Sequence, residues 1–327
     1  MKPVRAEIPF SSRRRQRVIA ALLRGSLRAL VRPLFHPAVP VAALRAGLRA
    51  SSAITLQAGG VTTRRERAAG VPVEWQTPSR AGAEVVLYLH GGAYCVGSPA
   101  THRGLTTHLA RYSGARVMVP DYRLAPEHPF PAACDDALAC YQWLLDQGHE
   151  SSQITIAGDS AGGGLALSTA LRIRDADLPA PARLALLSPW VDLTLTDRDA
   201  ARQPREHILS WETLAHAAEI YAGNRCGDPL ASPLLGDLRD LPPTLILVGT
   251  EEILLAEAER LARTLQGAGN DTALHVYQEL WHVFPVHAGI LDAADRALDS
   301  IARFIAGGQI SDLVESGQLR SPGPGTA

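Results

Sequence analysis

The sequence predicts an α/β fold, with one mostly parallel central sheet and helices on both of its faces. Two observations indicate this fold class. Short apolar segments alternate along the chain with longer helical segments, which is the pattern of parallel strands joined by crossover helices. Several of the short segments, such as 84–89 and 244–249, are apolar almost throughout, as expected of strands that are buried on both faces of a sheet.

The expected elements can be placed in chain order. Residues 1–50 have helical spacing, interrupted at Pro33, Pro37 and Pro40. Alternating residues over 61–76, with a turn at Ala69-Gly70, predict a β-hairpin. Further strands are expected at 84–89, 116–120, 153–157, 184–188, 244–249 and 273–277. Further helices are expected at 103–112, 132–147, 254–268 and about 288–306, and another begins after Gly164. A polar insert at about 191–235 and a disordered tail over 307–327 complete the chain.

The composition excludes several classes of protein. Of the 327 residues, 46% are apolar and 20% are charged, which is sufficient for a sizeable globular core. The net charge of −1 gives no basis for binding nucleic acid or an anionic membrane. The four cysteines, Cys95, Cys134, Cys140 and Cys226, lack any C-x-x-C pair or metal-ligand spacing, so we expect free thiols in a reducing cytosol, no metal and no cofactor.

The N-terminal segment combines arginines with apolar residues. Arg13-Arg14-Arg15-Gln16-Arg17 precedes an apolar run like that of a signal peptide, but further arginines interrupt the run and no convincing small-residue cleavage site follows. The sequence contains no stretch of 18 apolar residues. We therefore predict a cytoplasmic protein whose first 50 residues pack over the main domain, with a helix on a membrane surface as the rival interpretation.

The stretch 153–164 carries the clearest chemical motif. Gly158, Ser160 and Gly162 form G-x-S-x-G between an apolar strand and a helix of small residues. Glycines on either side let the strand and helix pass close together, and the sharp turn lifts the serine hydroxyl out of the sheet. The helix N-terminus adds a backbone N–H and the positive end of a dipole. This context predicts a nucleophilic serine rather than an ordinary glycine-rich turn.

Acyl transfer by a serine also needs a base, an acid that orients the base, and donors for the oxyanion. Glu251 and Glu252 follow the strand at 244–249, and His282 follows the strand at 273–277. Parallel strands end at the same edge of a sheet, so these side chains are expected near Ser160. His90-Gly91-Gly92-Ala93 follows another buried strand, and its glycines allow backbone N–H groups to point into a pocket.

Several motifs together resemble those of the hormone-sensitive-lipase-like (bacterial family IV) carboxylesterases of the α/β-hydrolase superfamily. The resemblance covers about residues 70–305. The matching motifs are His90-Gly91-Gly92-Ala93, Tyr122-Arg123-Leu124-Ala125-Pro126-Glu127, Gly158-Asp159-Ser160-Ala161-Gly162-Gly163, Ser188-Pro189-Trp190 and His282-Val283-Phe284. The resemblance implies an α/β-hydrolase fold with a helical cap formed by residues 1–50 and the insert at about 191–235.

The resemblance also assigns roles to individual residues. It implies Ser160 as the nucleophile, His282 as the base and Glu251, aligned with the family's aspartate, as the acid, with Glu252 as the alternative. Oxyanion donors are expected at Gly92, Ala93 and Ala161, with Gly91 shaping their loop. Ala93 replaces the family's usual glycine. Substrate-binding residues implied by the same motifs are Tyr94, Asp159 and Trp190.

The leading hypothesis is a serine carboxylesterase for small-molecule esters of short to medium acyl chain length. Lactone hydrolysis, notably of monoterpene ε-lactones, and amide hydrolysis or deacetylation would use the same residues and stay open. A small-molecule receptor on this fold is a hypothesis from another class, but the receptor branch lacks the catalytic histidine, and His282 is present. We expect no nucleic-acid partner, and a homodimer stays open.

Overall fold

The computed structural model describes residues 5–52, 55–199, 201–203, 205–308 and 310. Its centre is a nine-stranded sheet with the strand order β1-β9-β8-β7-β6-β4-β5-β3-β2. The strands are β1 (Arg5–Ile8), β2 (Val61–Ala68), β3 (Val71–Pro78), β4 (Val85–Leu89), β5 (Arg116–Pro120), β6 (Ile154–Asp159), β7 (Arg183–Leu187), β8 (Thr244–Gly249) and β9 (Thr272–Tyr277). Neighbouring strands are parallel, except that β3 is antiparallel to both β2 and β5.

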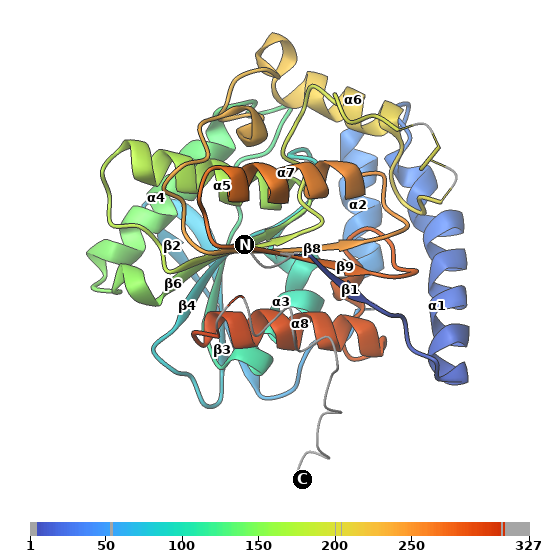
Figure 1. Ribbon diagram of the computed structural model, residues 1–327, viewed down its shortest axis with the longest axis horizontal. Helices are drawn as coiled ribbons and strands as arrows, with labels where there is room; N and C mark the ends of the chain where they lie inside the picture. Colours follow the sequence, from blue (N-terminus) through green and yellow to red (C-terminus); the bar gives the residue numbers. More distant parts are fainter. Residues whose placement is uncertain (1–4, 53–54, 200, 204, 309, 311–327) are drawn as a thin grey trace.

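Helices cover both faces of the sheet (Figure 1). The helices α3 (Pro99–Ser113) and α8 (Asp292–Ile305) pack on one face, and α4 (Ala132–Asp146), α5 (Ala161–Asp175) and α7 (Leu255–Gly267) pack on the other. Each face therefore has its own apolar core, because side chains alternate between the two faces along every strand. The mixed sheet and its two helical layers confirm the predicted fold class.

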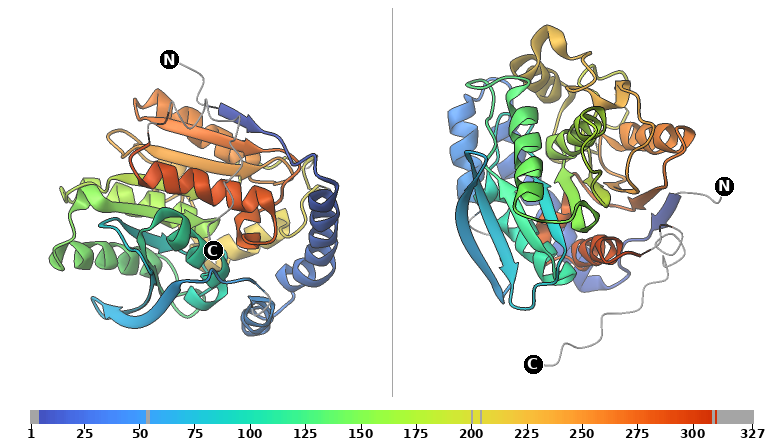
Figure 2. Two further views of the ribbon diagram at one scale, coloured as in Figure 1. Left: turned by 90° about the horizontal axis from the view of Figure 1, so that it is seen from below. Right: turned by 90° about the vertical axis from the view of Figure 1, so that its left-hand side faces the viewer.

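Two further segments lie above the carboxyl ends of the strands. The first contains α1 (Arg14–Ser26), a π-helical turn (Leu27–Val31), a 3₁₀ turn (Arg32–Phe35) and α2 (Val41–Ser52). The second contains α6 (Trp211–Tyr221) and the loop before it. Figure 1 shows α1, α2 and α6 outside the two helical layers, and Figure 2 shows β1 leading directly into α1. We call residues 14–52 and 206–221 together the cover.

The structure confirms most of the predicted strands and corrects the N-terminus. The hairpin over 61–76 is present as β2 and β3, and the strand predicted at 116–120 is β5. The segment over residues 1–50 was expected to be helical with interruptions at prolines, but its described part begins with the strand β1, which extends the sheet beside β9. Its four residues alternate between exposed and buried, a strand pattern too short to stand out beside the arginine-rich helix that follows.

Some predictions concern residues near the limits of the described chain. The tail predicted to be disordered lies outside the described residues, apart from Gly307, Gly308 and Ile310. Within the part of the chain that the structure describes, no helix is both long and apolar enough to span a lipid bilayer. The four cysteines are free, and all but Cys226 are buried.

Candidate active site

Ser160 lies on the sharp turn between β6 and α5. Its backbone has φ 53° and ψ −123°, a strained conformation for a residue with a side chain. Gly158 and Gly162 make the turn sterically feasible, because a Cβ on Gly158 would lie 2.2 Å from the Gly162 carbonyl oxygen. A Cβ on Gly162 would lie 2.0 Å from the carbonyl oxygen of Leu89 in β4. The turn therefore presents the Ser160 hydroxyl at the carboxyl edge of the sheet.

A chain of hydrogen bonds connects Ser160 with a histidine and a carboxylate. The His282 Nε2 lies 3.0 Å from Ser160 Oγ, and the His282 Nδ1 lies 2.9 Å from Glu252 Oε2. All three side chains are buried. The loops after β6, β8 and β9 thus bring a hydroxyl, an imidazole and a carboxylate into the order that serine hydrolases use.

The carboxylate against His282 belongs to Glu252, so the assignment of Glu251 is wrong by one residue. Glu252 Oε1 also accepts hydrogen bonds from the Gly249 N–H at 2.5 Å and the Ser188 hydroxyl at 2.8 Å, which fix its carboxylate. The physical reason is a turn after β8, in which the Glu252 N–H faces the Gly249 carbonyl. The turn directs Glu252 back over the strand end, while the Glu251 carboxylate contacts Arg24 and His207.

Glu252 also sets the protonation of His282. Burial alone would lower the pKa of His282, but the hydrogen bond that its ring donates to Glu252 and the negative charges of Glu252, Glu206 and Asp159 together raise it above its ordinary value. The carboxylate therefore stabilises an imidazolium at this position. This property suits a base that must hold a proton between two chemical steps.

The loop after β4 presents backbone N–H groups beside Ser160. Gly92 and Ala93 have positive φ angles of 124° and 52°, and a Cβ on Gly92 would lie 2.2 Å from the Val96 carbonyl oxygen. Among the described residues, we find no hydrogen-bond partner for the N–H groups of Gly92, Ala93 and Ala161. The Gly91 N–H instead donates to Asp159 Oδ1 at 3.0 Å, so it is not free to bind an oxyanion.

Asp159 holds the loop after β4 in place through hydrogen bonds. Its Oδ1 accepts hydrogen bonds from the Gly91 N–H and from the Tyr88 hydroxyl at 2.8 Å, and its Oδ2 lies 3.4 Å from His102 Nε2. Burial would raise the pKa of Asp159, but the charge and hydrogen bond of His102 lower it. For His102, burial would lower the pKa, but the charge of Asp159 and the hydrogen bond to it raise the pKa above its ordinary value. The pair therefore favours an imidazolium beside a carboxylate. Although Asp159 lines the cavity, its carboxylate oxygens face Tyr88, Gly91 and His102.

Two of the predicted substrate-binding residues do not line the cavity above Ser160. Tyr94 and Trp190 are almost fully buried, and neither lines the cavity above Ser160. Tyr94 stacks on Tyr221 with ring centroids 3.8 Å apart and lies 6.2 Å from Trp190. Their motifs place them under the site because Gly164 in α5 packs closely on both, with a Cβ there 2.1 Å from the Trp190 carbonyl oxygen. Packing therefore explains these two positions.

An apolar cavity of about 310 Å³ opens above Ser160 and His282. Gly92 and Ala93 line its floor, together with the triad serine and histidine. A large part of its wall comes from the cover. The cover residues that line it are Leu23, Ser26, Leu27, Leu30, Val31, Phe35, Leu48, Ser52, Ile208, Leu209 and Leu214.

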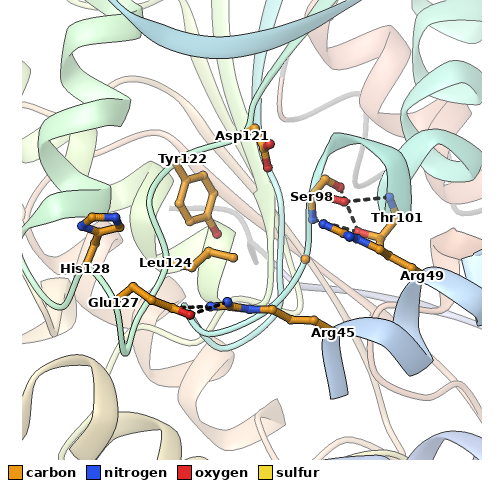
Figure 3. A pocket seen from close by; sticks show the side chains of 10 residues that line it. Arg45, Arg49, Ser98, Thr101, Asp121, Tyr122, Leu124, Glu127 and His128 are labelled. Atoms are coloured by element: carbon orange, nitrogen blue, oxygen red, sulfur yellow. Dashed lines mark hydrogen bonds and ion pairs between the residues drawn. The ribbon is translucent and has the colours of Figure 1, made fainter. Parts of the chain in front are cut away.

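A second, polar cavity of about 270 Å³ lies beside the first and shares Gly97 and Thr101 with it (Figure 3). Figure 3 shows Arg45 from α2 reaching Glu127 across this cavity. The Arg45 guanidinium lies 2.8 Å from the Glu127 carboxylate and donates to the carbonyl oxygens of Cys95 at 2.9 Å and Ala125 at 3.0 Å. These contacts fasten α2 to the loops after β4 and β5.

Within the described part of the chain, the titratable side chains do not form a metal-binding arrangement. In the described ranges, no group of three or more His, Cys, Asp or Glu side chains is placed to hold a metal ion. His102, which sequence reasoning missed, lies beside the oxyanion loop and pairs there with the Asp159 carboxylate. No motif marked His102, because its importance comes from the position of α3 against Asp159.

Comparison with known proteins agrees with this geometry. A family model described as the α/β-hydrolase fold matches residues 86–286. An acetyl-hydrolase from Streptomyces hygroscopicus is 42% identical over 71% of this chain and 78% of its own length. An esterase from Acinetobacter venetianus is 38% identical over 75% of this chain and 82% of its own length.

Solved structures give the same result. The structure of an esterase from the bacterial hormone-sensitive lipase family is 35% identical, with a TM-score of 0.84 over 92% of this chain and 100% of that one. A hormone-sensitive lipase from a metagenome library is 39% identical, with a TM-score of 0.83 over 89% of this chain and 98% of that one. The fold and the site define a hydrolase. The chain belongs to the hormone-sensitive-lipase-like carboxylic ester hydrolases of the α/β-hydrolase family.

Proposed function

We propose that this protein is a serine carboxylesterase that hydrolyses short- to medium-chain esters through Ser160, His282 and Glu252. The main observation behind this proposal is the chain of hydrogen bonds from Ser160 Oγ through His282 to Glu252. Ser160 and His282 lie on the floor of the apolar cavity. Among the described residues the N–H groups of Gly92, Ala93 and Ala161 have no hydrogen-bond partner, which supports the same assignment because such groups are suited to bind an oxyanion.

The proposed reaction has two halves. In the first, Ser160 Oγ attacks the ester carbonyl carbon while His282 Nε2 accepts the hydroxyl proton, and the resulting oxyanion binds the free N–H groups. His282 then donates that proton to the departing alcohol, which leaves an acyl-enzyme. In the second half, His282 accepts a proton from water as the water attacks the acyl carbon. The collapsing intermediate releases a carboxylic acid, and His282 returns the proton to Ser160.

The shape and chemistry of the cavity support the proposed preference for short to medium acyl chains. Its wall is aliphatic and aromatic, with Leu30, Phe35, Leu48 and Val286 among its residues. A volume of about 310 Å³ fits a chain of a few to several carbons better than a long fatty acid. The cover acts in this proposal as the cap that sets chain length, in line with the predicted roles of residues 1–50 and 191–235.

The location proposed for the enzyme is the cytoplasm. Supporting this are four cysteines that form no disulfides in the structure, of which Cys95, Cys134 and Cys140 are buried. Free thiols are typical of reducing compartments. Fractionation of the native host, followed by detection of the protein, would test this location.

The experiment that tests the function replaces the nucleophile. Ser160→Ala should reduce kcat on p-nitrophenyl butyrate by about 10⁴-fold or more, because the members of a triad act as a unit. Folding is checked by circular dichroism. Retention of a tenth of the wild-type kcat would exclude the mechanism. Wild-type rates on esters of graded acyl length, on lactones and on anilides separate the esterase from lactone hydrolysis and amide hydrolysis.

A further inference from the structure

Glu251 joins the two segments of the cover at a single carboxylate. Its Oε2 accepts a hydrogen bond from Arg24 Nε of α1 at 3.0 Å and lies 2.8 Å from His207 Nε2 in the loop before α6. The His207 side chain is 4% exposed, and those of Arg24 and Glu251 are 22% and 23% exposed. Two segments far apart in the sequence thus meet at the residue next to Glu252.

Arg24 also contacts the loop that carries the proposed base. Its guanidinium donates a hydrogen bond to the Glu279 carbonyl oxygen and lies 5.5 Å from the ring centroid of Trp281. Trp281 immediately precedes His282. Arg24 therefore touches both the loop of the acid and the loop of the base, although it contacts neither Glu252 nor His282.

A second connection holds the other side of Glu252. The buried Glu206 accepts hydrogen bonds from the N–H groups of His207 and Ile208, both at 2.9 Å, through its Oε1. Its Oε2 accepts one from the Ile253 N–H at 3.1 Å. The loop that leads into α6 is thereby attached to the chain on both sides of the proposed acid.

These contacts adjoin the wall of the apolar cavity. Leu23 and Leu27 lie within three residues of Arg24 in the sequence, and Ile208 and Leu209 follow His207. All four line the cavity. The position of the Arg24–Glu251–His207 cluster therefore determines where a large part of the cavity wall lies above Ser160.

We propose that Arg24, Glu251 and His207 form a latch that holds both segments of the cover over the cavity and thereby determines affinity for longer acyl chains. This inference rests on the proposed esterase function. Glu251 is a positioning residue, because its carboxylate faces the cover and not the reacting atoms. Burial would raise the pKa of Glu251, but the hydrogen bond from His207 and the charge of Arg24 lower it, which keeps the carboxylate ionised.

The test measures kcat and KM separately on a short and a long ester. Glu251→Gln keeps the size of the side chain and removes its charge, and Arg24→Met removes the partner. On p-nitrophenyl octanoate each variant should raise KM about tenfold and leave kcat within about threefold of wild type. The cavity wall contacts the long acyl chain in the substrate and in the transition state alike, so displacing the wall weakens both equally. On p-nitrophenyl acetate, whose acyl group reaches little of the wall, KM should change less than about threefold.

Two matched controls and a double variant sharpen the test. Arg15→Met and Glu219→Gln remove exposed charges from α1 and α6 and should leave both KM values unchanged. The effect of the double variant Arg24→Met/Glu251→Gln on KM should be smaller than the product of the two single effects, because both single variants break the same Arg24–Glu251 contact. Arg24→Lys keeps the charge but loses the branched set of donors, so it should fall between wild type and Arg24→Met.

Hydrogen exchange provides a direct readout of the latch. Amides in 14–35 and 206–214 should exchange faster in Glu251→Gln, while amides in 154–175 keep their wild-type rates. An unchanged KM for octanoate, a loss confined to kcat, or effects that multiply in the double variant would overturn the latch. If Ser160→Ala remains active, the esterase proposal itself fails. If Ser160→Ala is inactive but Glu251→Gln behaves as wild type, only the latch fails.

Discussion

The edge of the sheet that carries Ser160 and the cover above it are held in place by different interactions. At the edge, backbone and buried side chains fix each group. The Glu252 carboxylate, for example, accepts hydrogen bonds from Gly249 and Ser188 and pairs with His282. Removing any such partner leaves a buried polar group unsatisfied, which costs about 1–3 kcal/mol or more.

Arginine ion pairs contribute to the attachment of the cover. Arg17 lies 3.8 Å from Glu279, and Arg45 lies 2.8 Å from Glu127. Ion pairs between exposed side chains contribute about 0–1 kcal/mol each. The comparison teaches that changes at the sheet edge should act on kcat, whereas changes in the cover should act on KM. The predictions below test this division, beginning with the largest effect.

The largest effect is expected at Glu252. Glu252→Gln keeps the shape of the side chain but removes the charge that stabilises the His282 imidazolium. We expect kcat on p-nitrophenyl butyrate to fall about 10³- to 10⁴-fold, as when the triad acid of a serine protease is made an amide. Glu251→Gln is the matched control at the neighbouring position and should keep kcat. The opposite result would return the role of acid to Glu251.

The same substitution has a measurable effect on the titration of His282. In the wild type, Glu252 raises the pKa of His282 above 6.5, so the neutral base is lost as the pH falls through that higher value. In Glu252→Gln this support is gone, and the pKa of His282 should move down because burial still disfavours the imidazolium. NMR titration of the His282 ring in both proteins checks the shift. An unchanged or higher pKa in the variant would contradict the assignment.

An intermediate effect is expected at Asp159. Asp159→Asn removes the charge that pairs with His102 and weakens the acceptor that holds the Gly91 N–H. We expect a loss of about 10- to 100-fold in kcat, less than the 10²- to 10³-fold typical of removing an oxyanion donor. Steady-state kinetics on the butyrate ester measures it. An equal loss in kcat/KM that came from a raised KM alone would mean that Asp159 binds substrate instead.

The smallest effect is expected at Arg45, where the cover meets the polar cavity. Arg45→Met removes the ion pair with Glu127 and two hydrogen bonds to the carbonyl oxygens of Cys95 and Ala125. KM for p-nitrophenyl butyrate should rise about two- to fivefold with kcat unchanged, in keeping with a partly exposed contact. Arg49→Met on the same helix serves as the control, since Arg49 makes none of these hydrogen bonds. A fall in kcat would show that the cover affects chemistry as well.

The sequence predicted the parts of the molecule that depend on local patterns. Ser160 and His282 could be placed because a strand pattern precedes each, and the strain at Ser160 is encoded by its flanking glycines. The choice of Glu251 over Glu252 was wrong, since the position of the acid depends on how a single turn after β8 is hydrogen-bonded. Tyr94 and Trp190 belong to matching motifs, yet tertiary packing puts them beneath α5. The motif alone does not distinguish packing from binding.

The position of β1 has a practical consequence for exchanging caps between related enzymes. Ile8 pairs with Tyr277, and its carbonyl oxygen accepts the Gln278 N–H at 2.9 Å, just before the loop that leads to His282. A chimera joined at residue 50 would remove β1 and leave β9 as an open sheet edge, which invites aggregation. A junction between Ile8 and Arg14 instead keeps the native edge strand and transfers only the helices. A donor segment grafted there would report on substrate selectivity without the confounding loss of a strand.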